Sequence, residues 1–83
     1  MASKSKGNNF YVVLGLGKTG ASIIAYLVRK KIKVYGMDTR LSPPNIVQLK
    51  KSFSDVTYML GLIDHDLLDK CNLIVTSPGF KYE

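Results

Sequence analysis

The chain has 83 residues, of which 46% are hydrophobic and 22% are charged, and its formal net charge is +6. This length allows one small domain at most, and the composition is ordinary for a folded soluble protein. The single cysteine excludes an internal disulfide, and no apolar run reaches the roughly 18 residues of a membrane span. We therefore expect a soluble, cytoplasmic protein that binds no membrane.

The chain begins with a polar segment and continues into a strand. Residues 1–8 are mostly Ser, Lys, Gly and Asn, which predicts a disordered tail ahead of a domain over 9–83. The stretch over 10–14 is apolar, rich in β-branched and aromatic side chains, and lacks polar alternation. This pattern is typical of a parallel strand that is buried on both faces.

A glycine loop follows this strand directly. Gly15, Gly17 and Gly20 fit the pattern G-x-G-x-x-G, in which the first glycine allows a tight turn, the second lets a ligand approach the backbone, and the third lets a helix pack closely on the strand. The loop and the helix N-terminus aim N–H groups at an anion, so we expect a phosphate-containing nucleotide; a purely structural turn is the alternative. It is not a Walker A loop, because Gly20 precedes Ala21-Ser22 and Lys18 lies inside the loop.

The loop leads into a helix over about 19–30, where apolar residues recur at helical spacing and the Thr19 hydroxyl is suited to cap the first turn. The end of this helix carries a basic cluster, formed by Arg29, Lys30, Lys31 and Lys33. This cluster is expected at the far edge of the sheet from the glycine loop, where it complements the negative helix end. We therefore expect no nucleic acid as a partner.

The remaining chain alternates strands and helices. We expect strands over 32–37, 56–60 and 73–76 and helices over 46–53 and 65–70, with Asp64 as the N-cap of the last helix. The alternation predicts an α/β fold with a Rossmann-like, doubly wound parallel sheet. Residues 80–83 are too few to cover the sheet edge after the last strand, so we expect a truncated single domain from a longer protein.

Three segments are expected to meet at the carboxyl edge of this sheet, where doubly wound folds bind their ligands. They are the Gly15–Gly20 loop, the string Asp38-Thr39-Arg40 and the string Ser77-Pro78-Gly79. Lys18 and Thr19 can donate to phosphate or to a base edge, Asp38 can accept from ribose hydroxyls or a base N–H, Arg40 can bind phosphate, and Gly79 permits close backbone approach. The alternatives are that Asp38 only caps a turn and that Arg40 is a solvated surface charge.

The sequence offers no catalytic arrangement. His65 has no second His or Cys at metal-ligand spacing, and no Ser-His-Asp set or acid–base pair can be argued. We therefore expect a segment that binds a ligand, with no catalytic residue and no metal site of its own.

Together the three segments closely resemble the N-terminal domain of the Mur ligases of peptidoglycan synthesis. The similarity runs from Phe10 to Gly79 and is carried by residues 15–22, 37–44 and 73–79. It is greatest to the members that add D-glutamate to UDP-N-acetylmuramoyl-L-alanine.

The resemblance implies a Rossmann-like domain that holds the uridine nucleotide of that substrate. By motif, Lys18 and Thr19 would meet the diphosphate or uridine side, Asp38, Thr39 and Arg40 would surround the uracil and ribose, and Ser77 with Gly79 would line the opposite wall; Lys18 occupies a loop position that is often apolar in the family. Full-length members use ATP and Mg²⁺, held by a central domain, to make an amide bond needed for cell wall biogenesis, cell shape and cell division. The chain alone is expected to be inactive.

Two other functions fit the glycine loop. One is an NAD(P)-binding domain of an oxidoreductase, in which Asp38 would hold the adenosine ribose and Arg40 would accommodate a 2′-phosphate. The other is a non-catalytic nucleotide-sensing subunit. The Pro43-Pro44 and Ser77-Pro78-Gly79 strings favour the ligase domain through the resemblance alone.

Overall fold

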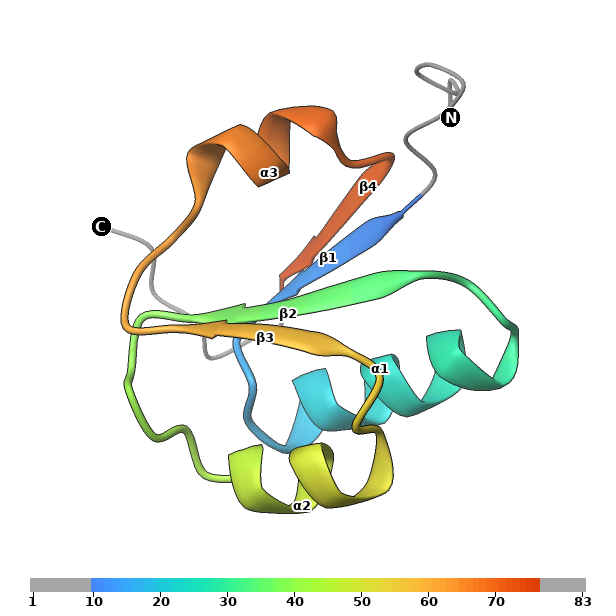
Figure 1. Cartoon of the computed structure of the whole chain (residues 1–83), viewed down its shortest axis with the longest axis vertical. Coiled ribbons are helices and arrows are strands. Elements are labelled where there is room, and N and C mark those ends of the chain that lie inside the picture. The colour runs from blue at the N-terminus through green and yellow to red at the C-terminus, as the bar shows by residue number, and fades with distance from the viewer. Residues whose placement is uncertain (1–9, 77–83) are drawn as a thin grey trace.

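The computed structural model describes residues 10–76, which form a four-stranded parallel sheet with helices on both faces (Figure 1). The elements alternate in chain order as the sequence predicts. Their bounds are β1 (Tyr11–Leu14), α1 (Lys18–Arg29), β2 (Val34–Asp38), α2 (Ile46–Ser52), β3 (Thr57–Leu60), α3 (His65–Lys70) and β4 (Leu73–Thr76).

The strand order is β3-β2-β1-β4, and every neighbouring pair is parallel. The chain builds outward from β1 to β3 and then returns to place β4 on the other side of β1, so the order reverses between β1 and β4. In Figure 1, α1 and α2 lie on one face of the sheet and α3 lies on the other. This arrangement is the doubly wound, Rossmann-like fold that the alternation of elements predicts.

The central strand β1 is buried on both faces. Its neighbours Val12 and Val13 are both 0% exposed and belong to different hydrophobic clusters, because successive side chains of a strand point to opposite faces. The cluster under α1 and α2 contains Val13, Leu16, Ile24, Leu27, Val34, Ile46 and Leu49, and the cluster under α3 contains Phe10, Val12, Leu14, Met37 and Cys71. The apolar run over 10–14 therefore supplies the interior of the domain, as expected.

Several boundaries differ by one or two residues from the sequence-based expectation, and two of these differences bear on the site. Helix α1 begins one residue earlier, at Lys18, with Gly17 as its N-cap and no side-chain capping bond, so the expectation that Thr19 caps this helix is wrong. Strand β2 covers 34–38 instead of 32–37, because Lys31 takes a left-handed conformation (φ 63°) after α1 and Asp38 still pairs with Leu60 of β3. Asp38 is thus the last residue of β2, and it pairs with Leu60 of the neighbouring strand β3.

The outer strand β4 is the least covered part of the sheet. Leu73 and Ile74 are 38% and 44% exposed, because β4 pairs with β1 on one side only among the residues that the structure describes. None of the helices within residues 10–76 has the length and apolar character needed to cross a membrane.

Candidate functional site

The glycine loop joins β1 to α1 at the carboxyl edge of the sheet. Each of its three glycines occupies a different structural environment. Gly15 has a φ of 96°, a left-handed conformation that side chains disfavour. A Cβ on Gly20 would overlap the carbonyl oxygen of Gly15, whereas a Cβ on Gly17 would meet nothing within 4 Å. The tight turn, the open approach and the close helix packing predicted from the pattern are therefore all present.

The loop leaves several backbone donors without a hydrogen-bond partner. The first hydrogen bond of α1 runs from the N–H of Ala21 to the carbonyl of Gly17 at 2.9 Å. The N–H groups of residues 17–20 have no hydrogen-bond partner within residues 10–76, and the first turn carries no acidic side chain. Unpaired amides at a helix N-terminus favour an anion, so this turn is suited to hold a phosphate group.

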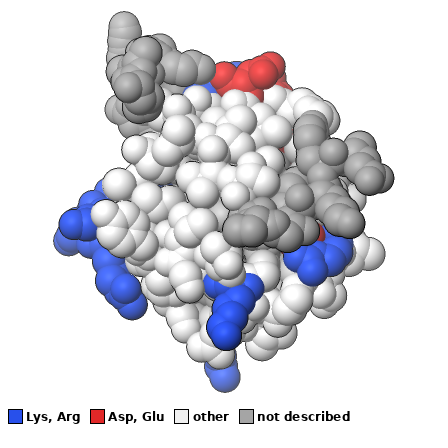
Figure 2. Space-filling view, turned by 180° about the vertical axis from the view of Figure 1, so that it is seen from behind, with Lys and Arg blue, Asp and Glu red and all other residues white. Residues whose placement is uncertain are grey.

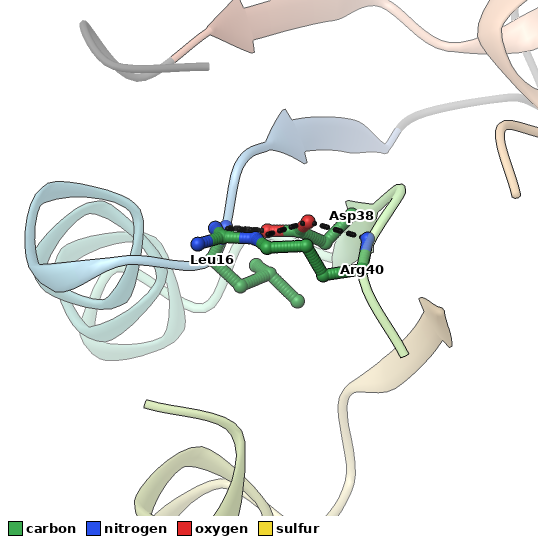
Figure 3. Close-up of polar contacts among 3 residues, drawn as sticks. All are labelled: Leu16, Asp38 and Arg40. Atoms are coloured by element: carbon green, nitrogen blue, oxygen red, sulfur yellow. Dashed lines mark hydrogen bonds and ion pairs between the residues drawn. The ribbon is translucent and has the colours of Figure 1, made fainter. Parts of the chain in front are cut away.

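Asp38 connects the glycine loop to the end of β2 (Figure 3). The backbone N–H of Leu16 donates to Oδ2 of Asp38 at 2.8 Å, and the backbone N–H of Arg40 donates to Oδ1 at 2.9 Å. The Arg40 side chain adds two bonds, from Nε to Oδ1 at 2.9 Å and from Nη2 to Oδ2 at 2.7 Å. One carboxylate thus receives four hydrogen bonds, two from backbone and two from a guanidinium.

These bonds keep Asp38 ionised in a buried position. Burial by itself would raise the pKa of Asp38, but the hydrogen bonds from the Arg40 side chain and from the Leu16 and Arg40 backbones outweigh it and lower the pKa to about 2. The side-chain hydrogen bond between Arg40 and Asp38 also raises the pKa of Arg40. Asp38 is therefore a carboxylate, and Arg40 a guanidinium, throughout the physiological pH range.

The fold brings the Gly15–Gly20 loop and Asp38-Thr39-Arg40 to the same edge, as the strand order requires. Lys18, Thr19, Thr39 and Arg40 are exposed there, whereas Gly15, Gly20 and Asp38 are buried. The backbone N–H of Arg40 donates to Asp38, so Asp38 caps the turn after β2, which is the structural role that the sequence also allowed for it. Arg40 is not simply solvated, because it is ion-paired to Asp38. Ser77 and Gly79 lie outside the described residues.

Two further residues, which the glycine pattern does not identify, help to position the loop. Leu16 has a side chain that is 0% exposed, so it anchors the loop in the core while its N–H reaches Asp38. Gly36 lies in the middle of β2, where a Cβ would approach Leu16 Cδ2 and Tyr58 Cδ1 to 3.0 Å. A glycine inside a strand is the one sequence signal of such a close approach, and it allows Leu16 to pack over β2.

The opposite edge of the sheet has a different character. A hollow of about 450 Å³ lies there between the ends of α1 and α2 and the beginnings of β2 and β3, lined in part by Lys31, Lys33 and Asp55. Figure 2 shows Lys and Arg side chains at both side margins and at the lower end of the face seen from behind, with Asp and Glu gathered at its top. Lys31 and Lys33 of the basic cluster line this hollow at the beginnings of the strands, whereas the glycine loop follows the end of β1, so these two lysines lie at the edge opposite the loop, as expected.

The described residues do not fit a metal ion. Within residues 10–76, no three His, Cys, Asp or Glu side chains come close enough together to hold one. The carboxylate of Asp38, which lies at the candidate site, already has four donors. We therefore assign no metal chemistry to these residues.

Residues 9–83 match the family model of the Mur ligase MurD-like N-terminal domain. A protein of Shewanella violacea named UDP-N-acetylmuramoylalanine--D-glutamate ligase is 42% identical over 72 residues, which cover 87% of this chain and 16% of the relative. Proteins of the same name from Marinobacter nauticus and Pseudomonas aeruginosa are 40% identical over 68 residues and 33% identical over 72 residues. These alignments cover 82% and 87% of this chain and 15% and 16% of those relatives. The chain therefore spans about one sixth of the length of the relatives that it matches.

Proposed function

This chain belongs to the family of MurD-like N-terminal domains of Mur ligases, and we propose that it binds the uridine nucleotide part of UDP-N-acetylmuramoyl-L-alanine. The observation that carries the proposal is the turn over 17–20, whose amides have no partner among residues 10–76 and whose preceding residue, Leu16, shares the Asp38 carboxylate with the Arg40 guanidinium at the carboxyl edge of the sheet. A nucleoside diphosphate supplies both an anion for these donors and a base with ribose hydroxyls for the end of β2.

The proposed roles follow the chain. The amides of the glycine loop, with Lys18 and Thr19 on the exposed first turn of α1, hold the diphosphate. Asp38, Thr39 and Arg40 surround the uracil and its ribose. Ser77 and Gly79 form the opposite wall, a role that rests on the family resemblance of their motif.

The larger activity belongs to the whole protein. The relatives are ligases by name, and we propose that this chain serves as the substrate-binding part of an ATP-dependent enzyme that adds D-glutamate in peptidoglycan biosynthesis in the cytoplasm. ATP and Mg²⁺ would supply the activation of the substrate carboxylate. From the family resemblance we propose that both are held by the rest of the protein and that the 83-residue chain is inactive alone.

A backbone-amide NMR titration of the 83-residue chain tests this proposal, with UDP-N-acetylmuramoyl-L-alanine, UDP and NAD⁺ added in parallel. We expect shifts at residues 15–20 and 38–40 with the two uridine ligands and none with NAD⁺. Shifts with NAD⁺ alone would overturn the proposal in favour of a dinucleotide-binding domain. If none of the three ligands shifts any backbone-amide resonance, this chain does not bind these nucleotides on its own.

A further inference from the structure

The hollow at the amino edge of the sheet is built by two equivalent connections of the chain. One connection runs from α1 into β2 and the other from α2 into β3, so two helix ends and two strand beginnings meet there (Figure 1). Its volume of about 450 Å³ lies within the range of about 300–1,000 Å³ that is usual for small-molecule sites. None of residues 15–20 and 38–40 lines it, so it is separate from the candidate nucleotide site.

Both walls of this hollow are fixed by hydrogen bonds within the chain. After α1, Lys31 takes a left-handed conformation, and its N–H donates to the carbonyl of Val28 at 2.9 Å. After α2, the carbonyl of Phe53 accepts from the N–H of Val56 at 3.2 Å and from the hydroxyl of Tyr58 at 3.0 Å. The fold itself therefore sets the shape of the hollow before any ligand arrives.

The lining combines apolar and charged residues. The apolar ones belong to the hydrophobic cluster under α1 and α2 or pack against it, and they are Val28, Ile32, Val34, Phe53 and Val56. The charged ones are Lys31, Lys33 and Asp55, which are all exposed and form no ion pair within residues 10–76. The Lys33 ammonium lies 5.6 Å from the centre of the Tyr35 ring. Two cations and one anion leave the lining with a positive charge.

The surrounding elements add to this positive charge. Neither α1 nor α2 contains an acidic residue, and the ends of these two helices carry Arg29, Lys30, Lys50 and Lys51. With Lys31 and Lys33 they make six cations, against about one negative charge from two helix ends and one from Asp55. A concave surface with an excess of one charge raises the local concentration of ligands of the opposite charge.

We propose that this hollow binds a small organic monoanion, with an apolar body against the hydrophobic cluster and a carboxylate or similar group beside Lys31 and Lys33. The apolar body would fill the part of the hollow that water covers in the free chain, and the anion would pair with cations that have no partner. Asp55 opposes a second negative charge on the ligand. This inference does not depend on the proposed function, because the two sites lie at opposite ends of β2.

A backbone-amide NMR titration of the 83-residue chain tests the proposal with two probes of equal ring size, 1-naphthaleneacetate and its uncharged amide, 1-naphthaleneacetamide. We expect the carboxylate to shift resonances of residues 28–35 and 52–57, and the amide to bind at least about fivefold more weakly. The proposal is overturned if the carboxylate shifts residues 15–20 and 38–40 instead, if the two probes bind equally well, or if neither binds.

Four charge variants identify the groups that recognise the anion. Lys31→Gln and Lys33→Gln should each weaken binding of the carboxylate about two- to fivefold and leave binding of the amide unchanged. Asp55→Asn should strengthen binding of the carboxylate by a similar factor. Lys70→Gln, on α3, removes the same charge away from the hollow and should change neither affinity. All four side chains are exposed, so we expect the variants to fold. Equal weakening by Lys70→Gln and Lys31→Gln would show that only net charge attracts the probe, and the proposed site would be wrong.

Discussion

The backbone N–H of Leu16 and the carboxylate of Asp38 are joined by a 2.8 Å hydrogen bond across 22 residues of chain. The bond ties the turn after β1 to the end of β2, the neighbouring strand, and holds the glycine loop against the strand that carries Arg40. An acidic residue at the end of the second strand therefore has a structural purpose in addition to any contact with a ligand.

The first prediction concerns acid stability. Asp38 has a folded-state pKa of about 2 against an ordinary value of 3.8, so it stabilises the fold above pH 3.8 and loses that contribution as the pH falls toward 2. The shift corresponds to at most about 2.5 kcal/mol of unfolding free energy. Denaturant unfolding at pH 6, 4 and 2.5 should show this loss in the native chain and not in Asp38→Asn. Asp55→Asn, at the opposite edge, is the control, and this variant should lose unfolding free energy at low pH as the native chain does.

A second prediction separates binding from folding at Gly17. Because a Cβ at this position meets nothing within 4 Å, Gly17→Val should keep the fold and cost roughly 1 kcal/mol, the difference between glycine and valine as an N-cap. Its side chain would stand over the free amides, so UDP affinity should fall at least about tenfold. Thermal unfolding by circular dichroism and titration calorimetry measure the two effects. Undiminished UDP binding would show that the loop does not hold the phosphates.

The third prediction is the converse, at Gly20. A Cβ there would overlap the carbonyl oxygen of Gly15, a backbone atom that cannot rotate away, so Gly20→Ala should force α1 away from β1. We expect a loss of about 1–3 kcal/mol or more in unfolding free energy, measured in urea. Gly17→Ala is the matched control, because the same methyl group enters open space. Equal stability of the two alanine variants would contradict the close packing described here.

The fourth prediction compares two helix starts. The Asp64 side chain accepts a 3.1 Å hydrogen bond from the N–H of Leu67, so Asp64→Ala should lower the unfolding free energy by about 1 kcal/mol. Thr19 lies inside α1 and makes no capping bond, so Thr19→Ala should change it by less than about 0.5 kcal/mol. Urea unfolding of the two variants checks the pair. A larger loss for Thr19→Ala than for Asp64→Ala would show that the helix starts are assigned wrongly.

Local patterns in the sequence determined the elements and their order. The apolar run over 10–14, the three spaced glycines and the capping residue Asp64 each specify structure over a few residues, so their reading does not depend on distant parts of the chain. The alternation of elements also determined a parallel sheet, because short connections through helices leave few other topologies. A parallel sheet places the carboxyl ends of its strands at one edge, so the glycine loop and Asp38-Thr39-Arg40 were expected to meet there.

Only the tertiary structure decided which groups are hydrogen-bonded to one another at that edge of the sheet. The sequence offered Asp38 either as an acceptor for a ligand or as the cap of a turn. Its bonds to Leu16 and to the Arg40 side chain appear only in the structure, and the bond to Leu16 depends on β1 and β2 being neighbours in register. Thr19 has no capping role because Gly17 is the N-cap of α1 and Thr19 lies within its first turn. Burial and hydrogen-bond partners depend on segments far apart in the chain, and for that reason a local pattern does not contain them.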